Sequence, residues 1–168
     1  LTWVLYGTLG LCAVVIIGGA ALALTPYGAF GKNWIDEALH GDERLTAANR
    51  VIQEVERTLD KDTYERALGG LRRLDQAIAR VPQVKGLQAY LVYANNLVVT
   101  RFGPDPSRIG RARRLLATLA DAPPGTPYLN LARASDTLMR GNAAEALRMA
   151  RRDPAGRDLA TLAAERLG

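Results

Sequence analysis

The chain contains almost none of the residues on which disulfides, zinc sites and nucleophilic active sites depend. Its 168 residues include one cysteine, Cys12, and one histidine, His40. A lone cysteine cannot form a disulfide within the chain, and a lone histidine cannot by itself build a zinc site of the Cys/His type. We therefore expect neither a disulfide framework nor a metal site.

Motifs that support catalysis are absent as well. A serine or cysteine nucleophile needs a histidine within reach, whereas Cys12 lies in an apolar run and His40 lies beyond its end. The sequence contains no P-loop and no dinucleotide-binding fingerprint. Carboxylates such as Glu54 and Glu56 stand two residues apart and do not share a face of a helix. We expect a protein that is not an enzyme and needs no cofactor.

Charged side chains are missing from the first 31 residues, which are dominated by an apolar run. Residues 1–24 read LTWVLYGTLGLCAVVIIGGAALAL. A helix of this length spans about 36 Å, enough to cross a hydrocarbon core of about 30 Å. Trp3 and Tyr6 stand near the start of the run and Tyr27 beyond its end, as aromatic side chains do at membrane interfaces. We predict a single transmembrane helix over residues 1–25.

Helix-breaking residues follow the apolar run. Pro26, Gly28 and Gly31 predict that the transmembrane helix stops near Thr25 and passes into a short non-helical stretch. We assign residues 26–41 to a juxtamembrane neck, in which a new helix is expected to begin over residues 33–39.

A cleaved signal peptide is an alternative interpretation of the apolar run. It would have a basic first part and a shorter apolar part, although Ala21-Leu22-Ala23 resembles a cleavage site. A lipid-modified Cys12 is disfavoured because apolar residues continue on both sides of it. Since no methionine stands at Leu1, we expect that the chain is part of a longer one.

Basic residues near the apolar run predict its orientation. Residues 25–43 contain one of them, Lys32, whereas the cytoplasmic flanks of membrane spans are usually rich in lysine and arginine. We therefore expect a single-pass protein of a bacterial inner membrane whose soluble part faces the periplasm rather than the cytoplasm. Residues that precede Leu1 could reverse this orientation.

The rest of the chain has the pattern of a helical domain. With 48% hydrophobic and 23% charged residues, the chain is able to bury a core. Apolar residues at steps of three and four predict helices over residues 45–59, 63–81, 87–98 and 109–119. Asp62 and Glu65 stand at capping-box spacing at the start of the second of these helices.

Capping signals predict three further helices. Thr126 and Pro127 should open a helix that ends at Gly141. Asn142 and Glu145 should cap a short helix that ends before Pro154. A last helix is expected over residues 157–167. No segment predicts a strand, so we expect an all-α fold.

Parts of this domain resemble the tetratricopeptide repeat, a pair of antiparallel helices. Residues 138–147, LMRGNAAEAL, are similar to the turn of the repeat, and Ala134 stands where its first helix carries a small residue. The second-helix alanines Ala112 and Ala146 are 34 residues apart, the length of one repeat. The first-helix pattern of the preceding repeat is matched by Tyr90, Tyr93, Ala94 and Asn95. Pro154 shortens the last repeat, so the array over residues 42–168 is degenerate. An unrelated helical bundle is the alternative.

The resemblance implies a superhelix whose concave face, built from first helices, binds an extended peptide or a partner helix. The residues that it would assign to this groove are Tyr90, Tyr93, Asn96, Thr100 and Arg101. In the alternative interpretation, the tyrosines pack between helical hairpins and the asparagines are solvated.

Charge predicts a second candidate surface. Residues 67–168 carry 16 basic and 8 acidic side chains, and nearly all of the basic ones are arginines. The arginines that crowd two of the predicted helices are Arg108, Arg111, Arg113, Arg114, Arg148, Arg151 and Arg152. Such a basic face permits contacts with acidic proteins, anionic lipid headgroups or nucleic acid. Nucleic acid is the least expected, because no aromatic residue lies within 108–114. A solvated helix face is the alternative.

These patterns favour a membrane-anchored scaffold subunit that binds other proteins in a bacterial envelope-spanning machine for secretion, envelope assembly or motility. One alternative is a chaperone-like accessory of a membrane translocon that holds extended clients. Another is a sensor of lipid headgroups or acidic polymers that uses the basic face.

Overall fold

The structure is a computed structural model that describes residues 26–59 and 63–167. These residues form seven α-helices and no strand, which confirms the predicted all-α fold. The helices are α2 (Pro26–Leu59), α3 (Tyr64–Arg80), α4 (Lys85–Phe102), α5 (Pro106–Thr118), α6 (Leu129–Met139), α7 (Ala143–Ala150) and α8 (Arg157–Glu165). The chain divides into two compact units, Leu1–Glu43 and Arg44–Gly168, and the second contains helices α3 to α8.

The predicted neck is helical. Helix α2 includes the whole of residues 26–41, so the expectation of a non-helical stretch after Thr25 is wrong. Pro26 stands in the first turn of α2, where its missing N–H has no intrahelical partner to lose. Gly28 and Gly31 each disfavour a helix by only about 1 kcal/mol, which a long helix tolerates.

No helix within residues 26–59 and 63–167 has the length and apolar character needed to cross a membrane. The transmembrane helix predicted over residues 1–25 lies outside the described residues.

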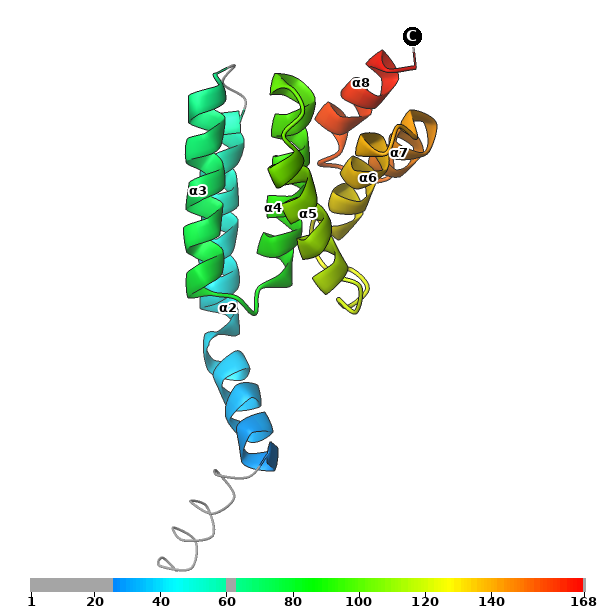
Figure 1. Ribbon diagram of the computed structural model, residues 1–168. Coiled ribbons are helices and arrows are strands. Elements are labelled where there is room, and N and C mark those ends of the chain that lie inside the picture. Colours follow the sequence, from blue (N-terminus) through cyan, green and yellow to red (C-terminus); the bar gives the residue numbers. More distant parts are fainter. Residues whose placement is uncertain (1–25, 60–62, 168) are drawn as a thin grey trace, which may run out of the picture. The chain divides into compact units, whose positions relative to one another are not determined.

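The second unit is a stack of helical pairs (Figure 1). Helix α3 runs back along the C-terminal part of α2, α5 runs back along α4, and α7 along α6. Neighbouring pairs are joined chiefly through α4, which packs against α3 on one side and against α6 on the other. Helix α8 packs mainly against α7.

Helix α4 is the centre of this unit. All residues from Gly86 to Val99 are buried, because α4 is surrounded by other helices. Ala89 and Val92 belong to one apolar cluster, shared with α5 and the start of α6. The tyrosines and most leucines of α4 belong to a larger cluster, shared with α2, α3, α6, α7 and α8. The single apolar stripe predicted for this helix therefore accounts for only one of its buried faces.

Polar side chains cap two of the helices. The Asp105 carboxylate accepts hydrogen bonds from the backbone N–H groups of Ser107 (3.0 Å) and Arg108 (3.2 Å) at the start of α5. A hydrogen bond from the Ser107 hydroxyl and the bond from Arg108 N–H hold the pKa of Asp105 below its usual value. Of the predicted cap of α7, the Asn142 part is confirmed, because Asn142 Oδ1 accepts from Glu145 N–H at 3.2 Å, whereas the Glu145 side chain binds Arg148 and not the Asn142 backbone.

Two other predicted helix starts are not confirmed. The start of α6 is wrong, and the start of α3 depends on a residue that lies outside the described ones. Helix α6 begins at Leu129, not at Pro127, because Tyr128 adopts a left-handed backbone conformation with φ of 62°. The Thr126 hydroxyl instead donates to the Pro123 carbonyl at 2.7 Å and closes a turn. Helix α3 begins after Thr63, which makes no side-chain cap, and Asp62 lies outside the described residues.

Candidate functional site

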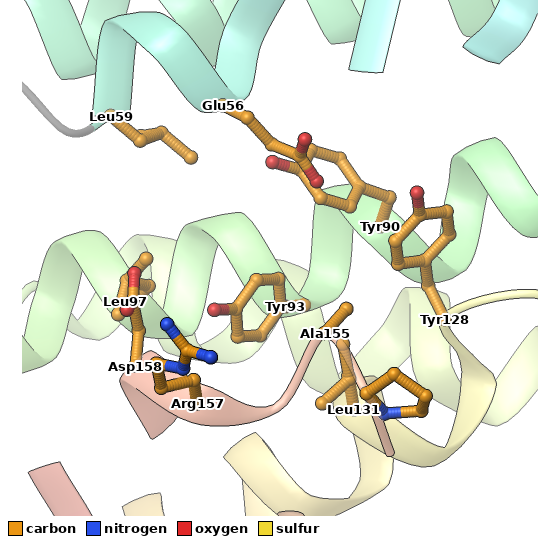
Figure 2. A pocket seen from close by; sticks show the side chains of 11 residues that line it. Glu56, Leu59, Tyr90, Tyr93, Leu97, Tyr128, Leu131, Ala155, Arg157 and Asp158 are labelled. Atoms are coloured by element: carbon orange, nitrogen blue, oxygen red, sulfur yellow. The ribbon is translucent and has the colours of Figure 1, made fainter. Parts of the chain in front are cut away.

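The structure contains a cleft of about 360 Å³ between helices that are far apart in the sequence (Figure 2). Helices α2, α4, α6 and α8 and the turns before α6 and α8 all contribute to it. Its lining residues are Glu56, Leu59, Tyr90, Tyr93, Leu97, Tyr128, Leu131, Pro154, Ala155, Arg157 and Asp158. In the order of the helical pairs, α2, α4 and α6 are the first helices, so the cleft lies on their shared face.

Three tyrosines form the floor of the cleft. The rings of Tyr90 and Tyr128 meet edge to face with centroids 4.9 Å apart, and those of Tyr90 and Tyr93 do so at 5.8 Å. Such pairs contribute about 0.5–1.5 kcal/mol beyond the burial of their area. Tyr90 and Tyr93 are buried, whereas Tyr128 is half-buried. The structure thus places two predicted groove residues, Tyr90 and Tyr93, in the cleft.

Tyr128 is a cleft residue that the sequence analysis missed. Its left-handed backbone is sterically unfavourable for a residue with a large side chain. The cause is local: Tyr128 lies between the turn at Thr126 and the first turn of α6, where it turns the chain. Burial, followed by the negative charges of Glu56 and Asp153, raises the pKa of the Tyr128 hydroxyl. In the sequence, a tyrosine that follows a proline gives no sign of a left-handed backbone or of a place in the cleft.

Charged side chains stand around the tyrosines. Figure 2 shows Glu56 reaching toward Tyr90 from α2, and Arg157 and Asp158 lying at the start of α8. These residues escaped the sequence analysis because they come from segments that the tetratricopeptide resemblance did not assign to the groove. The turn before α8 adds Pro154 and Ala155, both exposed.

Arg101, a predicted groove residue, joins two helices beside the cleft. Its guanidinium donates to the Leu59 carbonyl at the end of α2 (2.8 Å) and lies 3.5 Å from the Asp158 carboxylate of α8. Through these two contacts the Arg101 side chain links α4 to α2 and to α8. Arg101 therefore bounds the cleft through its two partners and is not one of the residues that line it.

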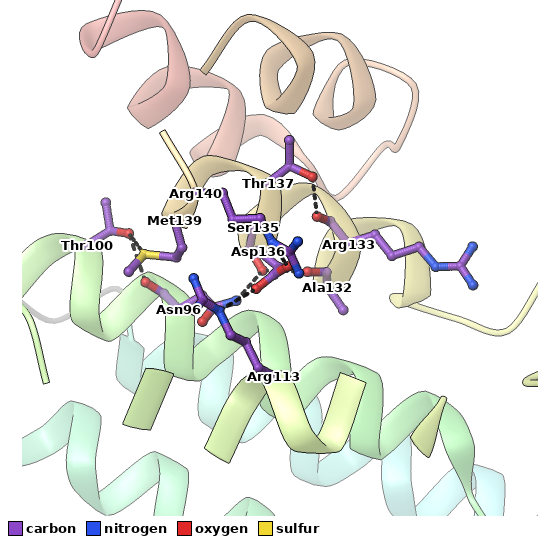
Figure 3. A network of polar contacts seen from close by, with 10 residues as sticks. All are labelled: Asn96, Thr100, Arg113, Ala132, Arg133, Ser135, Asp136, Thr137, Met139 and Arg140. Atoms are coloured by element: carbon purple, nitrogen blue, oxygen red, sulfur yellow. Dashed lines mark hydrogen bonds and ion pairs between the residues drawn. The ribbon is translucent and has the colours of Figure 1, made fainter. Parts of the chain in front are cut away.

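Asn96 and Thr100, the other two predicted groove residues, lie between α4 and α6 (Figure 3). Asn96 is buried, and its side-chain amide donates to the Ser135 hydroxyl at 3.0 Å. The Thr100 hydroxyl donates to the Asn96 carbonyl at 2.8 Å and lies 3.4 Å from the sulfur of Met139. The structure therefore places both side chains against α6, and neither residue lines the cleft.

A buried carboxylate continues the polar network of Figure 3. Asp136 follows Ser135 on α6, and its side chain is 8% exposed. It accepts a hydrogen bond from Arg140 Nε at 2.7 Å and lies 3.5 Å from Arg113 Nε of α5. Two guanidinium groups thus compensate one buried charge, as burial of a charge requires.

Arginines of the predicted basic face bind carboxylates within the protein. Arg111 of α5 forms a two-pronged ion pair with Asp75 of α3, and Arg108 lies 3.0 Å from Asp105. The pairs of Arg111 with Asp75 and of Arg113 with Asp136 tie α5 to α3 and α6, whereas Arg108 pairs with the residue that caps its own helix.

The arginines of α7 and the turn after it are more exposed. Arg148 Nε donates to Glu145 at 2.9 Å, and this bond lowers the pKa of the Glu145 carboxyl. Arg114, Arg151 and Arg152 are exposed. Of the seven arginines assigned to the basic face, four therefore form ion pairs inside the described part of the chain, which reduces the charge that the face offers to a partner.

A second hollow of about 400 Å³ adjoins the cleft at Tyr128. It shares Tyr128, Pro154 and Ala155 with the cleft and extends past them to Asn49, Pro127 and Asp153, among other residues. The cleft and this hollow share these lining residues, and together they are called the groove below. In the described residues, no three His, Cys, Asp or Glu side chains gather to hold a metal ion.

Comparison of this chain with family models, with curated proteins and with solved structures finds no match.

Proposed function

We propose that this protein is a membrane-anchored scaffold whose helical domain binds an extended segment of a partner protein in the tyrosine-floored groove. The main support for the proposal is the cleft itself. Residues of α2, α4 and α6, which are far apart in the sequence, line it together with three tyrosines whose rings contact one another. Tyrosines are enriched at protein interfaces because they offer a large apolar area and a polar tip.

The order of helix contacts supports a tetratricopeptide-like stack. Each pair, α4 with α5 and α6 with α7, packs internally, while α4 packs on α6 of the next pair. Small residues stand at the close contacts of α6 and α7, where Ala134 and Ala146 are fully buried. In such a stack the first helices line the concave face, and the first helices α2, α4 and α6 all contribute residues to the cleft. We therefore propose a degenerate tetratricopeptide-like domain over residues 42–168.

The dimensions of the groove favour a peptide. The cleft, about 360 Å³, and the adjoining hollow, about 400 Å³, each lie at the small end of ligand pockets, which span roughly 300–1,000 Å³. The adjoining hollow shares a wall with the cleft and extends it past Tyr128. An extended segment would place successive side chains in the two hollows.

The anchor and the location belong to the same proposal and rest on the sequence. The apolar residues 1–24 support a single span, and the scarcity of basic residues after it supports a periplasmic domain. We propose a subunit of a bacterial envelope-spanning machine. Carbonate extraction and protease protection of the full-length protein in cells test the anchor and its orientation.

In-cell photocrosslinking tests the groove. A photoreactive residue replaces Ala155, which is exposed and lines both hollows. The matched control carries the same residue in place of Ala144, an exposed alanine of α7. We expect one dominant protein adduct from position 155 that is absent from position 144.

Other outcomes of this experiment separate the alternatives. Many diffuse adducts from position 155 would favour a chaperone-like accessory that holds varied clients. Adducts that form only from a third position, Arg114, would move binding to the basic face. Identical patterns from positions 155 and 144 would refute a role for the groove.

A further inference from the structure

The groove has a charge that differs from that of the domain around it. The domain carries an excess of basic side chains, yet among the described residues that line the hollow beyond Tyr128 the one charged residue is Asp153. Glu56 lines the adjoining cleft, which shares Tyr128 with this hollow. The basic residue of the cleft, Arg157, stands next to Asp158 at the start of α8.

The two carboxylates act on the same ring. The negative charges of Glu56 and Asp153 both raise the pKa of the Tyr128 hydroxyl, in addition to the effect of burial. Tyr128 is half-buried, so part of its ring remains accessible from the groove. An aromatic ring flanked by carboxylates attracts a cation through its quadrupole and through the two charges.

We propose that the Tyr128 end of the groove binds a lysine or arginine side chain of the partner's extended segment, between Glu56 and Asp153. The inference rests on the proposed function of the groove and adds the chemistry of its ligand. The cationic group packs on the Tyr128 ring, and its N–H groups donate to the carboxylates. Apolar neighbours of this residue then enter the cleft over Tyr90 and Tyr93.

Charge also sets the direction of the segment. The end of the cleft near α8 contains Arg157 and Asp158, of opposite charge, whereas the Tyr128 end is acidic. A segment with one basic residue therefore gains more from placing it at Tyr128 than from the reverse orientation. Charge complementarity of this kind determines register and specificity more than it determines total affinity.

Selection from a displayed library of random dodecapeptides tests the inference on the full-length protein in mild detergent. We expect the enriched peptides to share a lysine or arginine beside an apolar residue. In the variant that combines Glu56→Gln with Asp153→Asn, this preference for a basic residue should disappear. Asparagine keeps the oxygen that accepts from Ala155 N–H at 3.1 Å. The matched control is Asp121→Asn, at an exposed residue outside both hollows.

Binding of one enriched peptide, measured by fluorescence anisotropy, makes the test quantitative. Replacing the basic residue of the peptide by norleucine should weaken binding to the unmodified protein about tenfold, in the range of a desolvated cation on an aromatic ring. The same replacement should have no effect on the double variant. Equal binding of both peptides to the unmodified protein, or enrichment of peptides without basic residues, would overturn the inference.

Ala155→Trp separates this failure from failure of the proposed function. Tryptophan at this exposed position fills the groove, whereas Ala144→Trp leaves it open. If Ala155→Trp abolishes binding of uncharged peptides, the groove binds peptides and only the cation preference is wrong. If no peptide is enriched, or if Ala155→Trp has no effect, the proposed function fails and the inference fails with it. Circular dichroism of each variant verifies that it is folded.

Discussion

Adjacent glycines in α3 should respond in opposite ways to the same substitution. A Cβ atom at Gly69 would meet no atom within 4 Å, whereas a Cβ at Gly70 would lie 3.1 Å from Val55 Cγ1 of α2. Both glycines lie inside a helix, where alanine is favoured over glycine by about 0.5–1 kcal/mol. Gly69→Ala should therefore stabilise the domain by about this amount.

The contact with Val55 opposes the same gain at Gly70. Val55 is fully buried and its branched side chain has few alternative rotamers, so α2 or α3 must shift by a few tenths of an ångström. Such overpacking costs about 1–3 kcal/mol. Since the helix-propensity term is common to both variants, their difference in the free energy of unfolding measures this cost. We expect Gly70→Ala to be the less stable variant by about 1–3 kcal/mol.

Thermal unfolding of the full-length protein, followed by far-UV circular dichroism in one detergent, measures the difference. For a domain of this size each kcal/mol corresponds to roughly 3–5 °C in Tm. Val55→Ala provides a further control, because it removes the contacting methyl groups. Combined with Gly70→Ala, it should lower stability less than the sum of the two single substitutions. A Gly70→Ala protein that melts at or above the Tm of Gly69→Ala would refute the packing argument.

Three further predictions concern single side chains. Asp136→Asn should reduce stability by about 1–3 kcal/mol in thermal unfolding, and Arg113→Ala or Arg140→Ala should each cost less, since one guanidinium then remains on the buried carboxylate. Asn142→Ala should lower stability by about 1 kcal/mol in the same assay, because α7 loses the acceptor for its first turn. Because the pKa of Tyr128 is raised in the folded state, its contribution to stability is present below the ordinary tyrosine pKa of about 10 and is lost as the pH rises above it. Tyr128→Phe should flatten this alkaline loss of stability, and an unchanged pH profile would contradict the shift.

Most helices of the domain could be predicted from the sequence. Apolar steps of three and four and the cap at Asn142 are local signals, and they predicted helices close to the observed α3, α4, α5 and α7. The prediction of the start of α6 failed, because the same short sequence pattern fits both a helix start and a turn. Thr126 and Pro127 suit a helix start, but they form a turn because Tyr128 adopts a left-handed conformation.

The candidate site could be predicted only in part. Tyr90 and Tyr93 were assigned to the groove and line the cleft, but Asn96, one helical turn further on, is covered by α6. The repeat pattern shows which residues belong to a first helix, whereas the face of that helix left open depends on how its neighbours pack. Glu56 and Asp158 could not be found in this way, because they come from opposite ends of the domain.

By itself, the sequence determined the all-α fold, the order of the helices and the excess of arginine, because these depend on residue type and on spacing within about ten residues. Only the tertiary structure decided which charges are compensated and where the groove lies. Arg111 and Asp75 are 36 residues apart in the chain, and their pairing exists because α5 packs near α3. The acidic end of a basic domain has the same origin, since Glu56 and Asp153 act together only where folding brings α2 and the turn before α8 to Tyr128.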